Sequence, residues 1–256
     1  MPQAIDHLVI AVPDPDAAAD ELERALGIAF PSGGRHPGVG TWNRIAFLDE
    51  PYLELIGVED AEAAGRWPVG AAAVRALEAN PDGAFATYAL LDDDLDATVA
   101  RLRARGSDIA RPAYGSRHTP SGETVEWWTA TFAHLAPDQP PFLIRHARTG
   151  AEWSDEAVRS RRSQLQPVGC VVALATLELS VPNPDLVARR YRSGRGLGPV
   201  PIEGDQHLTI GPHAVLLKSS ARGEPPATVV MACHGSTARS LDRFGVRFVM
   251  TGAATS

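Results

Sequence analysis

The chain has 256 residues, of which 44% are hydrophobic and 21% are charged, and its formal net charge is -7. A chain of this length and composition can fold as a globular protein with a sizeable core. The acidic balance excludes a general attraction to nucleic acid or to an anionic membrane surface. The chain opens with no signal-peptide pattern and holds no apolar run of about 18 residues, so we expect a cytoplasmic protein.

The two cysteines indicate no metal or redox motif. Cys170 and Cys233 stand in the apolar stretches VGCVVA and VVMACH and form no CxxC pair. Free cysteine is among the residues most often buried. We therefore predict two buried, reduced thiols.

A strand, a helix and a glycine recur three times along the chain. In the first unit, residues 5–12 are apolar and rich in β-branched side chains, which is typical of a strand. Asp14 can then cap a helix that begins at Pro15, and Gly27 can end it. In each unit the glycine stands 15 positions after the last residue of the strand. The three pairs are Val12 and Gly27, Leu91 and Gly106, and Val181 and Gly196.

Further short strands follow each helix, separated by Gly and Pro. The fold class predicted is α+β, with repeated βαβββ modules that form a curled mixed β-sheet cup with flanking helices. Residues 1–150 would hold two paired modules, and residues 170–256 a third, shorter module with a truncated fourth. In that fourth module we predict a helix over residues 236–245. Residues 61–81 are predicted to be a helical linker.

The order of motifs resembles a known superfamily. IDHLVIAV at residues 5–12 and GGRHPGVGTWNRIAFLDEPYLELI at residues 33–56 resemble the vicinal-oxygen-chelate superfamily, and in particular its glyoxalase-like domain family. That superfamily includes glyoxalases, extradiol dioxygenases, fosfomycin-resistance enzymes and bleomycin-binding proteins. The resemblance covers residues 4–147 well and residues 173–250 more weakly.

The resemblance implies a metal site at the first and last strands of a module. His7 and Glu54 stand at these positions, and His36 is the first choice for a third ligand, with His118, His146 and Glu126 as alternatives. Imidazole and carboxylate ligands suit a divalent ion such as Fe, Mn, Co, Ni or Zn. Such an ion can polarise two neighbouring substrate oxygens, while Glu54 and His36 move protons.

The second module departs from the glyoxalase pattern. The same count along the strands places Ala86 at the position of His7 and Ile144 at that of Glu54, and Thr176 takes the place of His7 in the third module. None of these side chains is a usual metal ligand. The four-ligand site of a glyoxalase is therefore not expected.

Four residues are candidates for contact with a substrate. Arg35 can bind a carboxylate or phosphate through its planar guanidinium group. Thr41 and Asn43 fall on one face of a predicted strand. Of the adjacent Trp127 and Trp128, one should face the cup, and we choose Trp128.

These features favour a metal-dependent enzyme that acts on a small oxygenated molecule as a lyase or isomerase through an enolate, and less strongly as a dioxygenase. The alternative is a metal-free small-molecule binding or resistance protein of the bleomycin-binding type. A structural or regulatory partner protein is the third hypothesis, since one fold hosts all of these roles. The sequence leaves open whether modules pair within one chain or across a homodimer.

Overall fold

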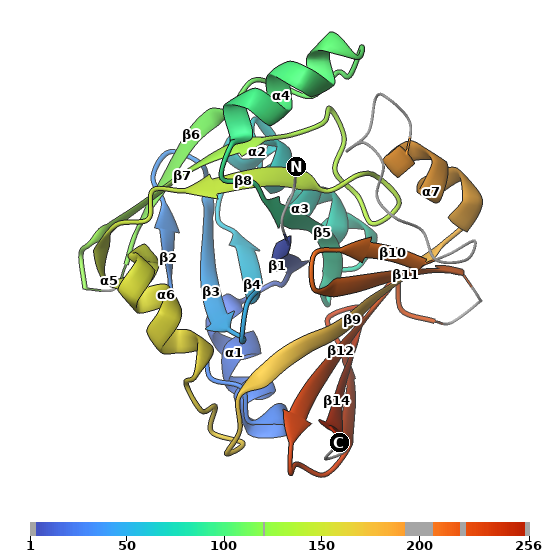
Figure 1. Ribbon diagram of the computed structural model, residues 1–256. Coiled ribbons are helices and arrows are strands. Elements are labelled where there is room, and N and C mark those ends of the chain that lie inside the picture. Colours follow the sequence, from blue (N-terminus) through green and yellow to red (C-terminus); the bar gives the residue numbers. More distant parts are fainter. Residues whose placement is uncertain (1–3, 120, 193–206, 221–223, 254–256) are drawn as a thin grey trace.

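The computed structural model describes residues 4–119, 121–192, 207–220 and 224–253 (Figure 1). These residues form a closed eight-stranded barrel in the order β1-β4-β3-β2-β6-β7-β8-β5 and a six-stranded sheet in the order β10-β11-β9-β12-β14-β13. The curled sheets and flanking helices confirm the predicted α+β class. The barrel strands are β1 (Ala4–Ala11), β2 (Ser32–His36), β3 (Thr41–Phe47), β4 (Tyr52–Val58), β5 (Ala84–Leu91), β6 (Ala113–His118), β7 (Thr124–Ala130) and β8 (Phe142–His146). The second sheet consists of β9 (Val172–Val181), β10 (His207–Ile210), β11 (His213–Ser219), β12 (Ala227–His234), β13 (Arg239–Arg243) and β14 (Val246–Ala253). The helices are α1 (Pro15–Leu26), α2 (Ala61–Gly65), α3 (Pro68–Ala79), α4 (Leu95–Ala104), α5 (Gly150–Trp153), α6 (Asp155–Arg162) and α7 (Pro184–Arg192).

The first helix begins and ends where the sequence indicates. The Asp14 carboxylate accepts hydrogen bonds from the backbone N–H groups of Asp16 at 2.9 Å and Ala17 at 3.2 Å. Pro15 occupies the first turn, where its missing N–H costs nothing. Gly27 adopts φ 71°, a left-handed conformation that ends α1 at low cost.

The barrel closes within one chain. Strand β1 pairs in parallel with β4 and antiparallel with β5, and β2 meets β6 through Arg35 and His118. Both seams between the first two modules are thus intramolecular, which answers the question that the sequence left open for this pair.

The predicted linker helix forms as α2 and α3. Gly70, Ala72 and Ala73 are its buried residues in α3, and their small side chains let the helix lie close to β5 and β4. Trp67 stands at the start of α3 and is 42% exposed.

The second sheet repeats the strand pairing of the barrel. Strand β9 pairs in parallel with β11 and antiparallel with β12, as β1 does with β4 and β5. The helix predicted over residues 236–245 is wrong, because β13 and β14 form a hairpin there. Phe244 and Gly245 make its two-residue turn with φ 51° and 60°, which is the turn that suits the twist of antiparallel strands. Gly196, the predicted end of the third helix, lies outside the described residues.

One hydrophobic core joins the two sheets. It lies between the outer face of the barrel, with Leu8 and Ile10 of β1, and the inner face of the second sheet, with Val229 and Phe248. The backbone N–H of Ile5 also donates a hydrogen bond of 3.1 Å to His213 Nδ1 across this boundary.

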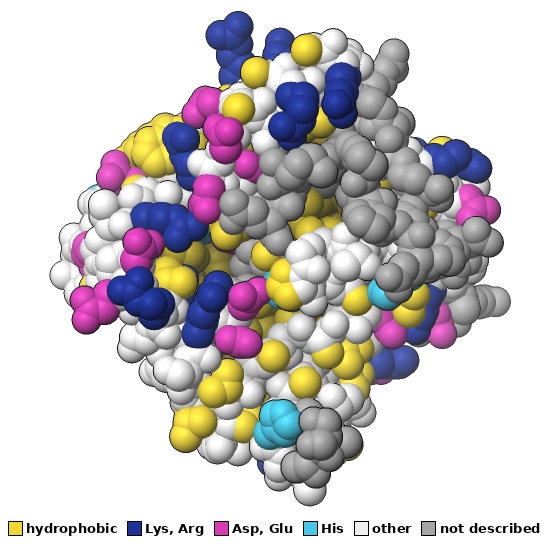
Figure 2. Space-filling view, in the orientation of Figure 1, with side chains coloured by type: hydrophobic (Ala, Val, Ile, Leu, Met, Phe, Trp, Pro, Cys, Tyr) yellow, Lys and Arg dark blue, Asp and Glu magenta, His cyan; other side chains and the backbone are white. Residues whose placement is uncertain are grey.

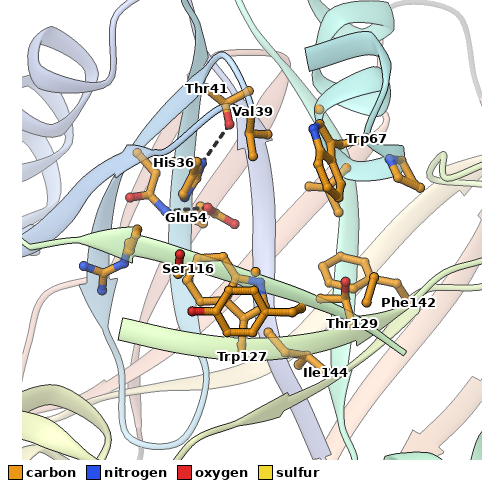
Figure 3. Close-up of a pocket in the computed structure, with 18 of the residues that line it drawn as sticks. His36, Val39, Thr41, Glu54, Trp67, Ser116, Trp127, Thr129, Phe142 and Ile144 are labelled. Atoms are coloured by element: carbon orange, nitrogen blue, oxygen red, sulfur yellow. Dashed lines mark hydrogen bonds between the residues drawn. The ribbon is translucent and has the colours of Figure 1, made fainter. Parts of the chain in front are cut away.

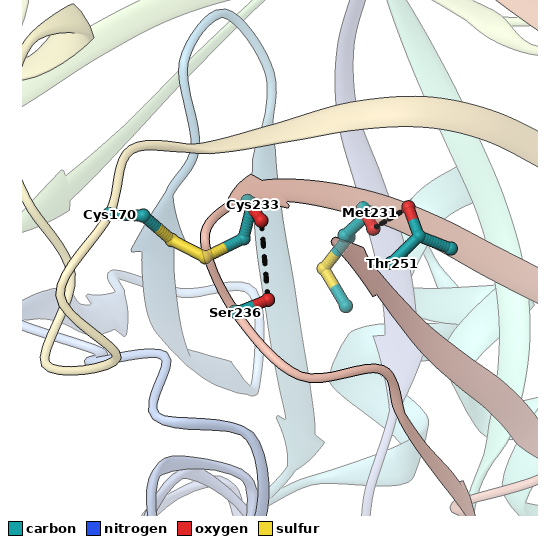
Figure 4. Close-up of a disulfide and its surroundings, with 5 residues drawn as sticks. All are labelled: Cys170, Met231, Cys233, Ser236 and Thr251. Carbon is teal, nitrogen blue, oxygen red and sulfur yellow. Dashed lines mark hydrogen bonds between the residues drawn. A yellow bond between two sulfur atoms is a disulfide. The ribbon is translucent and has the colours of Figure 1, made fainter. Parts of the chain in front are cut away.

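The two cysteines form a disulfide, so the prediction of reduced thiols is wrong (Figure 4). Cys170 leads into β9, and Cys233 pairs with Val172 near the end of β12, which brings the two Cα atoms to 5.8 Å. Apolar context predicted burial correctly but carried no information on this cross-strand proximity. Because disulfides persist mainly in oxidising compartments, the cysteines no longer support the predicted cytoplasmic location, which stays a prediction.

Charged side chains of both signs are interspersed over the face shown in Figure 2, with uncharged surface between them. Among the described residues, no helix has both the length and the apolar character needed to cross a bilayer.

Candidate functional site

The barrel encloses a cavity of about 520 Å³ (Figure 3). Its wall joins a polar part, with His7, Asn43 and Glu54, to an apolar part that includes Trp67 and Trp127. A cavity of this size with apolar walls and a few polar groups is typical of a small-molecule site.

The polar part is centred on His7 and Glu54. Both are buried, at 3% and 7% exposure, and His7 Nε2 lies 3.5 Å from Glu54 Oε2. Asn43 Nδ2 donates a hydrogen bond of 2.5 Å to Glu54 Oε1, and the ring of Tyr52 stacks on His7 at 4.5 Å. Burial, and then the charges of Asp6 and Glu54, raise the pKa of Tyr52 well above its ordinary value, so its phenol stays neutral. A carboxylate buried in this way needs hydrogen bonds and a positive partner.

Asp6 fixes the orientation of His7, and the sequence analysis missed it. A bulge in β1, between Ile5 and His7 in the pairing with β5, accommodates Asp6 as an extra residue. His7 Nδ1 lies 2.6 Å from Asp6 Oδ1, and His146 Nε2 lies 3.0 Å from Asp6 Oδ2. Burial alone would raise the pKa of Asp6, but the charges and hydrogen bonds of His146 and His7 outweigh it and hold that pKa well below its usual range. An ionised Asp6 accepts from His7 Nδ1–H, so that Nε2 is the ring nitrogen that faces Glu54.

His146 was only an alternative in the sequence analysis, yet it joins this cluster. Its ring stacks on that of Trp153 at 3.5 Å with an interplanar angle of 6°. Trp153 comes from α5, in a polar segment that gave no sign of a site. The guanidinium of Arg161 lies 4.3 Å above the Trp153 ring.

His36 lies on the upper wall in Figure 3, and its ring points toward Glu54. His36 Nδ1 is 2.7 Å from Thr41 Oγ1. Burial lowers the pKa of His36, and the negative charge of Glu54 opposes this shift only in part. The ring is therefore neutral near pH 7.

Two predicted substrate contacts lie outside the cavity. Arg35 is exposed on β2, with 70% of its side chain accessible, and forms an ion pair with Glu59. Trp128 lies under the Arg145 guanidinium, at 4.8 Å, on the outer face of the barrel. Strand alternation instead places Trp127 in the cavity, which corrects the choice between the two tryptophans.

The other predicted contacts, Thr41 and Asn43, do line the cavity from one face of β3. Arg117, which is 2% exposed and also lines the cavity, is a further residue that the sequence analysis missed. Its guanidinium pairs with Glu152 of α5 and donates a 2.9 Å hydrogen bond to the Gly33 carbonyl. Two of the alternative metal ligands stay apart from the cluster: His118 contacts Thr124, and Glu126 accepts from Tyr114.

Comparison with protein families assigns residues 5–194 to a family described as glyoxalase-like domain. The chain belongs to the glyoxalase-like domain family. The match covers most of the chain and confirms the resemblance read from residues 5–12 and 33–56. Comparison with the curated proteins gives no match.

Two solved structures share the fold of this chain. A hypothetical protein from Staphylococcus aureus superposes with a TM-score of 0.75 at 17% identity, over 97% of this chain and 99% of that chain. A mutant of 4-hydroxymandelate synthase from Streptomyces coelicolor gives a TM-score of 0.53 at 15% identity, over 91% of this chain and 72% of that chain. Methylmalonyl-CoA epimerase from Streptomyces coelicolor gives 0.43 at 19% identity, over 57% and 99%.

The strand register shows which residues of the second module are equivalent to His7 and Glu54. They differ from those assigned from the sequence. The backbone N–H of Val12 bonds to Ile56 O and that of Asp92 to Ile144 O, both at 2.9 Å. These equivalent bonds make Val12 correspond to Asp92, one residue beyond the position assumed from the sequence. The residue equivalent to His7 is then Thr87 instead of Ala86, and Phe142 replaces Ile144 as the residue equivalent to Glu54. The second module still offers no imidazole or carboxylate at either place.

The predicted triad of His7, Glu54 and His36 is not assembled as a metal site. Within residues 4–119, 121–192, 207–220 and 224–253, no three His, Cys, Asp or Glu side chains are arranged to hold one ion. The pair of His7 and Glu54 does have suitable spacing, because two ligand atoms each about 2.1 Å from an ion at a tetrahedral angle lie roughly 3.4 Å apart. Asn43 Oδ1, next to this pair, is buried without a hydrogen-bond partner among the described residues. These three groups fit a divalent ion with open coordination positions.

Proposed function

We propose that the barrel cavity is the active site of an enzyme that moves a proton on a small oxygenated organic substrate, as an isomerase or lyase that passes through an enolate. The observation that carries the proposal is the buried contact of 3.5 Å between His7 Nε2 and Glu54 Oε2 on the cavity wall. Two acceptors that face each other at this distance, away from water, call for a cation or a proton between them.

His7, Glu54 and Asn43 are the residues that would hold a divalent ion. When bound, the ion would stabilise negative charge on two neighbouring substrate oxygens. Asp6 would keep the His7 Nε2 lone pair directed at the ion, as carboxylates commonly do for histidine ligands. The Asn43 amide would fix the Glu54 carboxylate through Oε1.

Proton transfer falls to His36 and Glu54, which lie on the same wall. Burial keeps His36 neutral, and a neutral imidazole can accept a proton from a carbon next to a carbonyl group. Thr41 would hold the His36 ring in place through Nδ1 and leave Nε2 for the substrate. The apolar wall would exclude water from the charged intermediate.

The test is elemental analysis of the full-length protein, purified without chelator, beside the variants His7→Ala and Glu54→Gln. His118→Ala is the matched control, since this histidine lies outside the cavity. We expect near-stoichiometric divalent metal in the wild type and the control, and at least a tenfold loss in both site variants. Wild type that binds no Fe, Mn, Co, Ni or Zn, either as purified or after addition, would refute the metal-dependent form of the proposal.

The reaction is tested by NMR in D₂O with a panel of α-keto and α-hydroxy acids. An isomerase or lyase that passes through an enolate exchanges the substrate proton for deuterium, and His36→Ala should slow this exchange by about 10²-fold or more. Consumption of dioxygen with bound iron would instead indicate a dioxygenase.

A metal-free binding protein is the second candidate. It is favoured by Thr87 and Phe142 at the second pair of ligand positions, and by the aromatic wall that includes Trp67 and Trp127. Tight binding of an apolar compound without metal, deuterium exchange or oxygen uptake would support it.

A further inference from the structure

Two buried polar atoms of residues that line the cavity are not explained by the His7–Glu54 pair. His146 Nδ1 and Trp153 Nε1 are both buried and find no hydrogen-bond partner among the described residues. Both side chains line the cavity, and their rings lie face to face at 3.5 Å. Buried polar groups are rarely left unpaired in folded proteins, so two in one stacked pair indicate a missing partner.

The chemistry of that partner follows from the two rings. The indole Nε1–H of Trp153 can only donate. His146 Nε2 lies 3.0 and 3.1 Å from the two oxygens of the Asp6 carboxylate, which accepts its proton. An imidazole that carries its one proton on Nε2 presents Nδ1 as an acceptor. The partner must therefore accept from Trp153 and donate to His146.

Neighbouring side chains hold the rings of His146 and Trp153 in place. Asp6 fixes His146 through Nε2, and the Arg161 guanidinium covers the Trp153 ring. Tyr52 and Phe47 pack against Trp153 at ring distances of 5.6 and 6.2 Å. Neither nitrogen can find another partner by a small rotation of its ring, because these contacts hold both rings in place.

We propose that His146 and Trp153 form a second polar subsite of the cavity, which binds a hydroxyl group of the substrate. A hydroxyl oxygen can accept from Trp153 Nε1–H while its proton is donated to His146 Nδ1. A ketone or a carboxylate cannot donate, and an ether cannot either, so the subsite selects the hydroxylated compound. The inference rests on the proposed function only in taking the cavity as the substrate site.

The test uses three probes of similar size: 3-phenyllactate, its O-methyl ether, and 3-phenylpropanoate, which lacks the hydroxyl. Binding to the full-length protein is followed by ¹H–¹⁵N NMR of the tryptophan indole groups. The Trp153 signal is assigned by its loss in Trp153→Phe. His146→Phe removes the acceptor and keeps an aromatic ring, and Trp128→Phe and His118→Phe are matched controls outside the cavity.

We expect 3-phenyllactate to bind roughly tenfold more tightly than the other two probes and to shift the Trp153 indole signal. This preference should disappear in Trp153→Phe and His146→Phe and persist in both controls. Equal affinity for the three probes, no binding of 3-phenyllactate, or a preference that survives both variants would overturn the subsite. A fixed water in the subsite would appear as a Trp153 signal that no probe moves, which also overturns it. The indole shift in the wild type decides the question even if His146→Phe fails to fold.

The same titration with His7→Ala separates this inference from the proposed function. A hydroxyl preference that is lost in His7→Ala but kept in Trp153→Phe and His146→Phe places the hydroxyl at the His7 pair, and the subsite is refuted. A preference that survives in His7→Ala supports the subsite, whereas the metal content of the wild type decides the metal-dependent form of the proposed function.

Discussion

The barrel and the second sheet use the same strand pairing, but among the described residues only the barrel holds a cluster of buried polar side chains. In the barrel, β1 carries His7, and β4 places Glu54 opposite Val9. In the second sheet the corresponding residues are Thr176 and Leu216. Backbone pairing is therefore shared, whereas the chemistry depends on a few side chains of the first module.

A bulge occurs at the equivalent position of the first strand in all three modules. The pairing register shifts at Asp6 in β1, at Ala86 in β5 and at Ala175 in β9. Thr87 and Thr176 follow the last two bulges as His7 follows the first. The bulge is thus a property of the repeated module. Of these three bulges, only the one in β1 has an aspartate followed by a histidine, and only that bulge contributes to the site.

Asp6→Ala should have the largest effect on stability, because it leaves His7 and His146 without their shared acceptor. Breaking a buried, paired charge typically costs about 3–5 kcal/mol. The measurement is the free energy of unfolding in urea at pH 7. Asp242→Ala, which removes an exposed ion pair with Arg247, is the control and should cost no more than about 1 kcal/mol. If both variants lose the same small amount, the bulge aspartate is not the organiser of the cluster.

Removal of the disulfide should affect the second sheet alone. Cys170→Ser with Cys233→Ser should lower the free energy of unfolding by about 2–4 kcal/mol, since the bond closes a long loop in the unfolded chain. Hydrogen exchange should become faster in β9 and β12 and stay unchanged in β1 and β4. Faster exchange throughout the barrel would show that the two sheets do not unfold separately.

The boundary between the sheets should respond to pH through His213. Burial lowers the pKa of His213 to about 4, whereas an unfolded histidine titrates near 6.5. Between these values the unfolded chain binds more protons, so stability is full above about pH 6.5 and falls as the pH drops toward 4. The slope from one proton is at most about 1.4 kcal/mol per pH unit.

The check is urea unfolding between pH 4 and pH 7 for the wild type and His213→Gln, whose amide can still accept from Ile5 N–H. The variant should show a shallower slope by this single-proton contribution. Parallel curves would mean that the contact between His213 and β1 does not titrate.

The smallest effect is expected for Arg35→Ala. Arg35 pairs with Glu59 at the surface, and such pairs contribute about 1 kcal/mol or less. Ligand affinity, measured by the same NMR titrations, should equal that of the wild type. A large loss of affinity would mean that Arg35 does contact the ligand.

The strands and helices of the first module could be predicted because their signals are local. A stretch of apolar and β-branched residues predicted β1, and Asp14, Pro15 and Gly27 predicted the ends of α1. The hairpin at Phe244 was missed because a short polar stretch has no clear period, and its strand is formed by pairing with β14. Propensity is weak where tertiary contacts decide.

The candidate site was predicted in part for the same reason. His7 and Glu54 were predicted from the ligand positions of the family that the sequence resembles, and Asn43 from the strand alternation that puts it on one face with Thr41. Asp6 is also next to His7 in the sequence, but ordinary alternation would turn it to the other face, so only the bulge brings it into the cluster.

The sequence by itself determined the family, the repeated module and the buried pair of His7 and Glu54, because strand periodicity and motif order depend on neighbours along the chain. Tertiary structure alone decided the rest. Distances between residues far apart in sequence decide whether His146 contacts Asp6 and stacks on Trp153, and whether the two cysteines bond. The strand register decides whether Trp127 or Trp128 faces the cavity. A shift of one residue in a strand turns its side chains to the other face, and the sequence does not fix register to that accuracy.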